Sequence, residues 1–347
     1  MARIFQLLRT GQTLTRQEIA GKLALSMPTT LQNVTGLMEL GVLEECGAAR
    51  SSGGRKAKML RLRREAGQAV GINIGVHHVE FAVTDLLGNL QQAGSAPLAF
   101  RDEPDWYHQF QLALMDFLTK HQLASSRILG GGVSFPGIID GGQVTRSHIL
   151  GLSHMGLDRF QKVLPFPAVF ANDANCACFA ERHAARDSYV YLSLNESVGG
   201  AVMLNGRLWT GDTFQAGEIG HMLLVPKGRL CYCGKRGCAD AYLSPQALER
   251  DGWDVYLDHL AILLTNLRML LNMDLVAGGQ VGAQIGPFLE QLRSKAAQYD
   301  RFARDVDYIY PCSQREYACA LGAAGFGLER FGVRILPQGT AQKEPGW

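Results

Sequence analysis

The sequence predicts an α/β protein in which a small winged helix-turn-helix domain precedes a larger body of two α/β lobes. Three observations support this prediction. The first 65 residues contain capped helices and a basic, glycine-rich loop. After them, glycine turns alternate with short β-rich runs. The length of 347 residues is also greater than that of one compact domain. The expected division is a head (1–65), a first lobe (66–187), a second lobe (188–330) and a C-terminal tail (331–347).

Three short helices are predicted in the head. Residues 1–9 form an amphipathic first helix, and a capping box of Thr15 and Glu18 begins the second. Ser26 can cap the third helix, with Pro28 tolerated in its first turn. Two helices joined by a short link are typical of a helix-turn-helix, in which the second helix enters the major groove of DNA.

The spacing of apolar and polar residues along the third helix predicts an inner and an outer face. The apolar residues expected to face inward are Leu31, Val34, Leu37 and Met38. The polar residues expected on the outer face are Thr29, Thr30, Gln32 and Asn33. Because such side chains donate to base edges or phosphates, we predict that these four contact double-stranded DNA.

A wing is predicted after the third helix. Two strands, 42–46 and 57–62, flank a basic, glycine-rich loop at 51–56, whose Arg55 and Lys56 are expected to contact the phosphate backbone. The head has eleven Lys and Arg against five Glu, whereas the whole chain has a net charge of only +2. This distribution indicates a polyanion partner for the head alone. The alternative is a helical subdomain that docks another protein and has a solvated basic surface.

The body is predicted from short β-rich runs and helical stretches between turns. The expected strands are 70–74, 79–84, 90–96, 128–134, 168–171, 189–194, 201–204 and 275–277, and the expected long helices are 106–121 and 258–273. The first three strands form an antiparallel meander. We recognise neither a signal peptide nor a membrane-spanning run, so we expect a cytoplasmic protein.

A metal site is predicted from one histidine and three bunched cysteines: His221, Cys231, Cys233 and Cys238. In a chain with no recognisable export signal, this bunching favours metal ligation over disulfides. Three thiolates and one imidazole satisfy tetrahedral Zn²⁺, and a closed four-ligand site is structural rather than catalytic. The alternative is three buried thiols at a turn.

Polar residues that suit a hydroxylated ligand flank this site in the sequence. Asn172 and Asp173 stand where a predicted strand gives way to a helix, so Asp173 either accepts a hydroxyl proton at the lip of a cleft or only caps the helix. Glu218 and Asp240 place carboxylates beside His221 and the cysteines. Carboxylate and imidazole groups suit the adjacent hydroxyls of a sugar. The alternative is a surface acid beside an ordinary zinc ligand.

These motifs together resemble the ROK family (repressors, open reading frames and kinases), and within it the NagC/Mlc-type branch of winged-helix repressors. The family pattern Glu-x-Gly-His, then Cys-x-Cys-Gly-x-x-Gly-Cys-x-Glu, is met from Glu218 to Asp240, with Asp for the final Glu. The resemblance implies a duplicated actin-like (hexokinase-like) ATPase fold, operator DNA and a sugar or sugar phosphate as partners, and a homodimer or homotetramer. The ligand contacts that it implies are Gly137, Asn172, Asp173, Glu218, His221 and Asp240.

The sequence departs from the family's kinases at both phosphate loops. The first, Asp-x-Gly-x-Thr in kinases, runs from Asn73 to His77 here, and the second has Glu196 where the γ-phosphate approaches. A carboxylate there repels nucleotide. We therefore expect no catalytic residues, and a sugar-responsive transcriptional repressor without enzymatic activity. The short stretch between Ser244 and the helix expected at 258 also predicts a trimmed cleft edge or dimer surface.

Two other functions stay open from the sequence. Asp173 is retained as a base for a sugar hydroxyl, which favours an ATP-dependent sugar kinase with an appended DNA-binding head. A regulator that reads a protein signal instead of a sugar is the other alternative.

Overall fold

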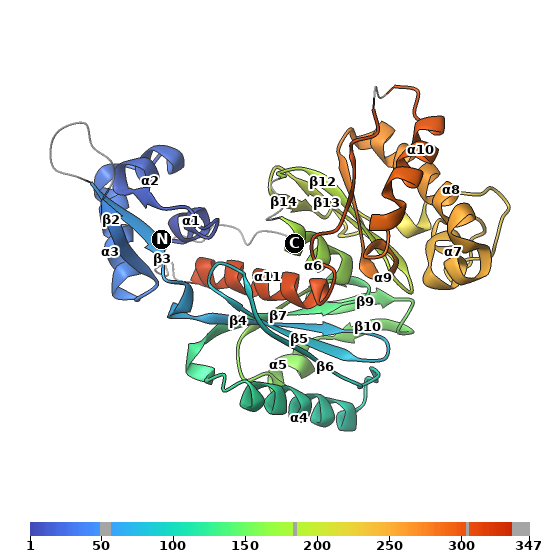
Figure 1. Ribbon diagram of the computed structural model, residues 1–347. Helices are drawn as coiled ribbons and strands as arrows, with labels where there is room; N and C mark the ends of the chain where they lie inside the picture. The colour runs from blue at the N-terminus through green and yellow to red at the C-terminus, as the bar shows by residue number, and fades with distance from the viewer. Residues whose placement is uncertain (49–56, 183–185, 303–304, 335–347) are drawn as a thin grey trace.

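The computed structural model describes residues 1–48, 57–182, 186–302 and 305–334, which form a head and a two-lobed α/β body (Figure 1). A three-stranded sheet belongs to the head, and each lobe is built on a five-stranded sheet. The predicted α/β class is confirmed. Within the described ranges, no helix is long and apolar enough to cross a membrane.

The head is a winged helix, as predicted. Its elements are α1 (Ala2–Leu8), β1 (Leu14–Thr15), α2 (Arg16–Leu23), α3 (Met27–Glu39), β2 (Leu43–Ala48) and β3 (Lys58–Leu62), with the strands in the order β1-β3-β2. Both predicted caps are present. The Thr15 hydroxyl accepts from the Glu18 N–H while the Glu18 carboxylate accepts from the Thr15 N–H, and the Ser26 hydroxyl caps the first turn of α3. The loop with Arg55 and Lys56 lies outside the described residues.

The buried face of α3 differs from the predicted one. Thr30 is fully buried and its hydroxyl donates to the Ser26 carbonyl oxygen at 3.0 Å, whereas Leu31 is 52% exposed. The buried face of α3 is formed by residues at i, i+4 and i+7, namely Thr30, Val34 and Leu37. Leu31, the next residue after Thr30, is rotated about 100° around the helix axis from it and so lies off this face. The prediction that Thr30 contacts DNA is therefore wrong, because its side chain belongs to the core of the head.

The two lobes repeat one sheet topology. The first-lobe strands are β4 (Gln68–Ile74), β5 (Val79–Asp85), β6 (Leu90–Ala96), β7 (Ile128–Phe135) and β11 (Ala168–Asn172), in the order β11-β7-β4-β5-β6. The second-lobe strands are β12 (Tyr189–Leu194), β13 (Val198–Leu204), β14 (Arg207–Trp209), β15 (Asp274–Gly278) and β16 (Ile309–Pro311), in the order β14-β13-β12-β15-β16. In each lobe an antiparallel meander of three strands is extended by two parallel strands.

Helices and one small sheet complete the lobes. The first lobe has α4 (Pro104–Lys120), α5 (Asp158–Val163) and α6 (Asp173–Glu181), and the second has α7 (Asp240–Leu243), α8 (Pro245–Leu271), α9 (Gly279–Gly282) and α10 (Leu289–Tyr299). Short 3₁₀ turns are η1 (Arg64–Ala66), η2 (Ser125–Arg127), η3 (Ile219–His221) and η4 (Gly286–Phe288). Strands β8 (Ile138–Asp140), β9 (Gln143–Ser147) and β10 (Leu152–Gly156) form a separate sheet that we did not predict.

The long helix of the second lobe begins earlier than predicted. We expected it at 258–273, but α8 begins at Pro245, where the Ser244 hydroxyl accepts from the Ala247 N–H at 3.3 Å. Gly252, with φ at +74°, interrupts the helix. The helical spacing of apolar residues is broken there, so the first two turns could not be predicted from it. The stretch after Ser244 is therefore helical, and the expected helix is the second part of a longer one. The trimmed cleft edge or dimer surface stays a prediction.

The last helix, α11 (Ala318–Arg334), packs on the first lobe. It lies across β4 and β7 and against α6 (Figure 1). A Cβ on Gly71 of β4 would lie 1.7 Å from the Ala320 carbonyl oxygen, so this close contact of helix and strand requires glycine. The predicted bounds of the second lobe (188–330) are wrong for this helix, and the predicted tail (331–347) begins inside it.

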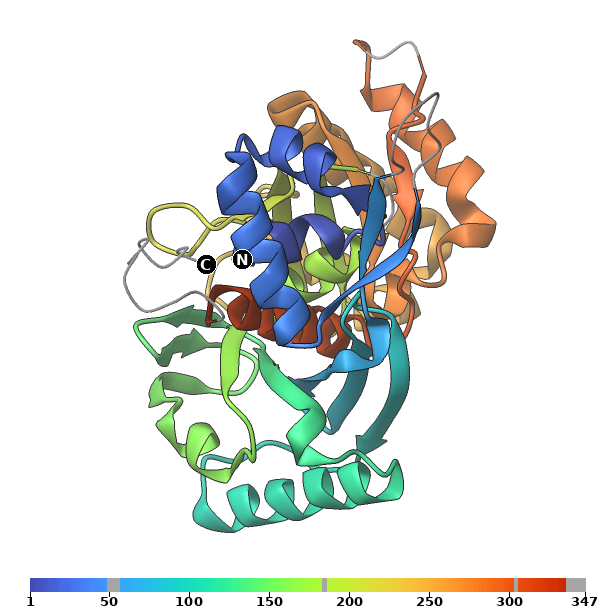
Figure 2. The same cartoon turned by 90° about the vertical axis from the view of Figure 1, so that its left-hand side faces the viewer.

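The head packs directly on the body through the same helix. Phe5 and Leu8 of α1 are fully buried in one apolar core with Ala324 and Leu328 of α11. The ring of Phe331 meets that of Phe5 edge to face at 5.8 Å. Figure 2 shows α11, in red, between the blue helices of the head and the first-lobe sheet. Head and body therefore form one folded unit.

Candidate functional site

The four predicted metal ligands lie together. The ligand atoms of His221, Cys231, Cys233 and Cys238 are all within 4.8 Å of one another. Cys233 Sγ lies 3.7 Å from Cys238 Sγ, and Cys231 Sγ lies 3.8 Å from His221 Nδ1. In a tetrahedral site with metal–sulfur bonds of about 2.3 Å, neighbouring sulfurs are about 3.8 Å apart. The donor set and its spacing therefore fit a metal ion.

The cysteine loop, residues 231–238, is held in its shape by its own backbone. The Cys231 N–H donates to the Lys235 carbonyl oxygen at 2.8 Å. Gly237 has φ at +87°, and a Cβ there would lie 1.9 Å from the Val225 carbonyl oxygen. Only glycine fits this position, so the turn that brings the last cysteine back depends on it.

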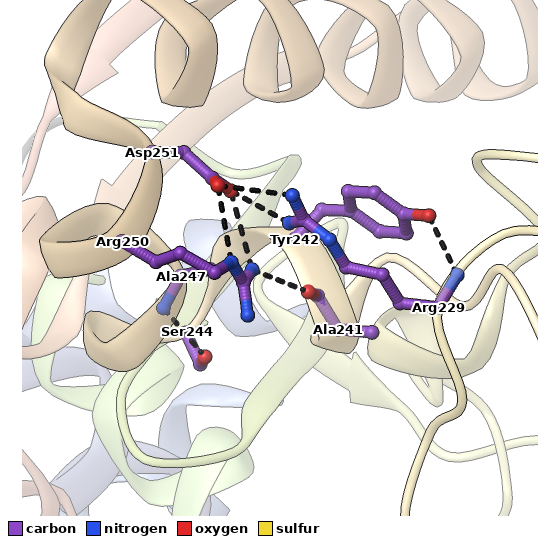
Figure 3. A network of polar contacts seen from close by, with 7 residues as sticks. All are labelled: Arg229, Ala241, Tyr242, Ser244, Ala247, Arg250 and Asp251. Atoms are coloured by element: carbon purple, nitrogen blue, oxygen red, sulfur yellow. Dashed lines mark hydrogen bonds and ion pairs between the residues drawn. The ribbon is translucent and has the colours of Figure 1, made fainter.

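A polar network connects Arg229, two residues before the cysteine loop, to α7 and α8 (Figure 3). Arg229 pairs with Asp251 through two hydrogen bonds, of 2.6 and 2.9 Å, and Arg250 meets the same carboxylate at 3.0 and 3.2 Å. The Arg229 N–H also donates to the Tyr242 hydroxyl at 2.8 Å, and its guanidinium lies over the Tyr242 ring. Hydrogen bonds from Arg250 and Arg229 lower the pKa of Asp251 to about 2. The carboxylate is therefore ionised near neutral pH.

His221 connects the cysteine loop to a cleft between the lobes. Its Nδ1 faces Cys231, and its Nε2 lies 3.9 Å from Glu218 Oε2. With Nδ1 as a metal ligand, Nε2 would be left to donate a hydrogen bond on the cleft side. The ring is thus part of both sites.

The cleft has a volume of about 360 Å³. Five of the six predicted ligand contacts line it: Gly137, Asn172, Asp173, Glu218 and His221. Pockets for small molecules have volumes of about 300–1,000 Å³, so one monosaccharide-sized ligand fits here.

Asn172 joins two walls of the cleft. Its Oδ1 accepts from the Asn175 N–H at 3.1 Å and so caps α6, and its Nδ2 donates to the Gly137 carbonyl oxygen at 3.0 Å. One N–H of its amide is then left for a ligand. The residue both positions the wall and can take part in binding.

Two carboxyl groups in the cleft have raised pKa values. Burial raises the pKa of Asp173 to about 6, and the negative charge of Glu218 contributes in the same direction. Partial burial also raises the pKa of Glu218. Near neutral pH, Asp173 can therefore accept a hydrogen bond or, when protonated, donate one.

Asp240 lies behind the cleft wall and not in it. Its side chain is buried, and its Oδ2 accepts from the Val198 N–H at 2.7 Å. Burial raises its pKa to about 6. This carboxylate fixes the start of β13 to α7, so the predicted contact between Asp240 and a ligand is wrong.

Two rings that no motif indicated also line the cleft. The ring centroids of His148 and Tyr232 are 5.6 Å apart, and they lie 6.2 and 5.4 Å from that of His221. His148 follows β9 of the small sheet, so its place depends on a sheet that we did not predict. Arg146 and Lys235 add positive charge to the same lining.

A larger cavity of about 690 Å³ adjoins the cleft and shares Asp173 with it. Both altered phosphate loops line this cavity. The Asn73 amide donates to Glu80 at 3.0 Å, and His77 Nε2 lies 3.6 Å from Glu196 Oε1. Two carboxylates, those of Glu80 and Glu196, therefore line this cavity.

The outer face of α3 carries three of the four predicted DNA contacts. Thr29 and Gln32 are exposed, and Asn33 is half-buried. Met27 and Leu31 are exposed on the same helix, at 45% and 52%. This face therefore combines hydrogen-bond donors with apolar groups, which suit the methyl group of thymine.

Several basic side chains of the head are paired within it. Arg16 and Lys58 both contact Glu45. Glu44 lies 2.7 Å from Arg61 and 3.7 Å from Arg63. These pairs neutralise part of the positive charge that the composition indicates.

Known proteins match this chain over its body. The model of the ROK family matches residues 69–254, more than half of the chain. The xylose repressor of Bacillus subtilis (strain 168) is 29% identical over 242 residues, which are 68% of this chain and 63% of the repressor. The DNA-binding transcriptional dual regulator NagC of Escherichia coli (strain K12) is 23% identical over 256 residues, 72% of this chain and 63% of NagC. The chain thus covers less than two thirds of either relative.

Two solved structures share the fold. A ROK family transcriptional regulator, a homologue of the E. coli MLC protein, matches with a TM-score of 0.77 and 17% identity over 96% of both chains. A ROK hexokinase from Thermus thermophilus matches with a TM-score of 0.61 and 23% identity over 74% of this chain and 96% of its own. The winged head on a duplicated actin-like ATPase fold is confirmed.

Proposed function

Because the chain belongs to the ROK family, we propose that it is a transcriptional repressor that binds operator DNA through the head and a sugar or sugar phosphate in the cleft. One observation carries the proposal: the winged head and α11 share an apolar core, and α11 packs on the sheet whose strands border the cleft. A DNA-reading surface and a sugar-sized cleft are thereby parts of one folded unit.

In this proposal α3 enters the major groove. Thr29, Gln32 and Asn33 donate to base edges, and Arg55 and Lys56 of the wing contact phosphates. Two heads are needed for a two-fold symmetric operator, so we propose a homodimer or a homotetramer.

The ligand in the cleft is a sugar or a sugar phosphate. Asp173, Glu218 and His221 offer the donors and acceptors that adjacent hydroxyls require, and the nearby rings cover an apolar ring face. Arg146 and Lys235 are placed to meet a phosphate group on the same ligand.

We further propose that the cysteine loop holds a structural Zn²⁺ through His221, Cys231, Cys233 and Cys238. Four protein ligands leave no open position for catalysis, so the ion supplies rigidity. It would hold His221 and Tyr232 where they line the cleft.

We propose that the protein does not phosphorylate sugars. Glu80 and Glu196 stand in the cavity where a nucleotide would bind, and Asn73 lacks the charge that holds Mg²⁺ in kinases. One observation favours the alternative of a sugar kinase: Asp173, with a pKa of about 6, is suited to accept a hydroxyl proton. A coupled assay that finds turnover of about 1 per second or more with any hexose would establish the kinase instead.

The test of the repressor uses the full chain and an operator selected from random DNA. Fluorescence anisotropy measures DNA affinity with and without a panel of sugars and sugar phosphates. A coupling of about 1–3 kcal/mol predicts a change of about 5- to 150-fold with one of them. Asp173→Ala should lose this response but keep DNA binding, whereas Asp158→Ala, at an exposed position on α5, should respond normally. The proposal fails if no carbohydrate changes DNA affinity, or if Asp173→Ala responds like the unchanged protein.

A further inference from the structure

A buried arginine lies where the head meets the body. Arg9, which follows α1, is only 2% exposed. It lines a cavity of about 280 Å³ together with Arg182, which follows α6 in the body. The other walls come from the turn at 88–90, from Phe179 and Ala180 of α6, from Gln314 and from α11. The cavity thus touches the head, the first sheet and the helix that joins them.

The guanidinium of Arg9 is largely without partners. One terminal nitrogen donates to Gln6 Oε1 at 3.2 Å, but Nε and the other terminal nitrogen are buried and have no hydrogen-bond partner in the described parts of the chain. A guanidinium has five N–H donors and stays charged in proteins. Burial lowers the pKa of Arg9 and the charge of Arg182 lowers it further, while the charges of Glu329 and Asp85 offset only part of this effect. A buried guanidinium with two N–H-bearing nitrogens that lack an acceptor calls for an anion.

The carboxylates nearby are already engaged. Glu329 accepts from Arg182 at 2.7 Å. Asp85 accepts from Arg64 at 3.0 Å and from the N–H groups of Leu87 and Asn89 at 2.9 Å. These acids therefore accept hydrogen bonds from other donors, and no described carboxylate accepts from the two unpaired nitrogens of Arg9, a residue that lines the cavity.

We propose that this cavity is a site for a small oxyanion, phosphate or the phosphate group of a small metabolite, which binds between Arg9 and Arg182 and fastens the head to the body. The planar fork of arginine suits the oxygens of phosphate. A volume of about 280 Å³ admits a phosphate and a small attached group. The anion bridges head and body because one arginine comes from each, so it stabilises their docked arrangement.

The oxyanion site is distinct from the sugar cleft. The two cavities have no lining residue in common among those described. A phosphate that binds here would therefore act as a second signal, in addition to the sugar.

Thermal unfolding of the full chain tests this proposal without DNA or sugar, so its outcome is separate from that of the repressor proposal. Inorganic phosphate is compared with chloride at equal ionic strength. Glycerol 3-phosphate is measured as well, to distinguish binding of a phosphate group on an organic molecule from binding of free phosphate. Saturating phosphate or glycerol 3-phosphate should raise Tm by about 4 °C or more. Arg9→Met should abolish the rise, whereas Arg3→Met, at an exposed arginine within α1, should keep it.

A second variant keeps the test decisive if Arg9→Met does not fold. Arg182→Lys retains the positive charge beside Glu329 but loses the fork, so it should need more phosphate for the same rise in Tm. The proposal is overturned if neither phosphate compound stabilises the protein more than chloride does. It is equally overturned if Arg9→Met and Arg182→Lys respond like the unchanged protein.

Discussion

Asp251→Asn is the sharpest test of how the cysteine loop is held. The substitution keeps the shape of the side chain and removes the charge that four hydrogen bonds from Arg229 and Arg250 stabilise. The pKa of Asp251 is about 2 instead of its usual 3.8. At about 1.4 kcal/mol per pKa unit, the ionised carboxylate stabilises the folded state by roughly 2 kcal/mol. Half of Arg250 is exposed, so solvent reduces the expected loss to about 1–2 kcal/mol.

The pH dependence of this loss of stability follows from the direction in which the pKa of Asp251 is shifted. The folded pKa lies below the unfolded value, so the stabilisation is fully present above about pH 4 and is lost as the pH falls through about 2. The difference between the unchanged protein and Asp251→Asn should therefore be constant from pH 5 to 8 and shrink below pH 4.

Urea denaturation of the zinc-loaded protein measures this difference. A chelator assay in parallel should show faster zinc loss from Asp251→Asn, because Arg229 lies two residues before Cys231. Asp254→Asn is the matched control on the same helix, since Asp254 is exposed and pairs with Lys295. Equal stability and equal zinc loss in Asp251→Asn and the unchanged protein would refute the reasoning.

Further substitutions test the metal site, the head and their packing. Cys233→Ser should lose stoichiometric zinc in metal analysis and lower Tm, whereas Cys46→Ser should do neither; retained zinc would count against the site. Gly237→Ala should destabilise the same loop in urea, because its Cβ would lie 1.9 Å from a carbonyl oxygen. Gln32→Ala should reduce discrimination between operators by about 1–3 kcal/mol per base pair contacted, and unchanged discrimination would exclude a base contact. Phe5→Ala should cost about 3–5 kcal/mol in urea denaturation, and a loss below about 1 kcal/mol would show that the head is loosely docked.

Features that depend on neighbouring residues were predictable from the sequence. The capping box of Thr15 and Glu18 is a local signal, and the structure contains it. The clustering of His221 with the three cysteines was also predictable, because the cysteine loop closes on itself over a few residues and His221 follows a short family pattern. The meander β4–β6 lies within two residues of its expected bounds, because its turns and alternation are local as well.

Features that depend on long-range packing were not predictable. Nothing near His148 indicates that the small sheet places it beside Tyr232. Asp240 stands at the last position of the family pattern, where the family has Glu, but its carboxylate accepts a hydrogen bond from Val198, 42 residues away. Thr30 was placed outside because Leu31 has the more apolar side chain, whereas the phase of the helix is set by its contacts with the rest of the head. Arg9 gave no signal at all, since its burial exists only where the head meets the body.

The packing of α11 also sets an order of events during synthesis. About 250 residues separate Gly71 of β4 from the start of α11, which at about 5–20 residues per second corresponds to roughly 12–50 s of translation. Throughout that time the parts of the first sheet and of α1 that pack on α11 lack this cover, although α1 also packs on α2 and α3 within the head. These parts are covered only when the last helix leaves the ribosome. A chain cut short before Ala318 would therefore expose apolar surface on the first sheet and on α1, and it would be a substrate for chaperones and proteases.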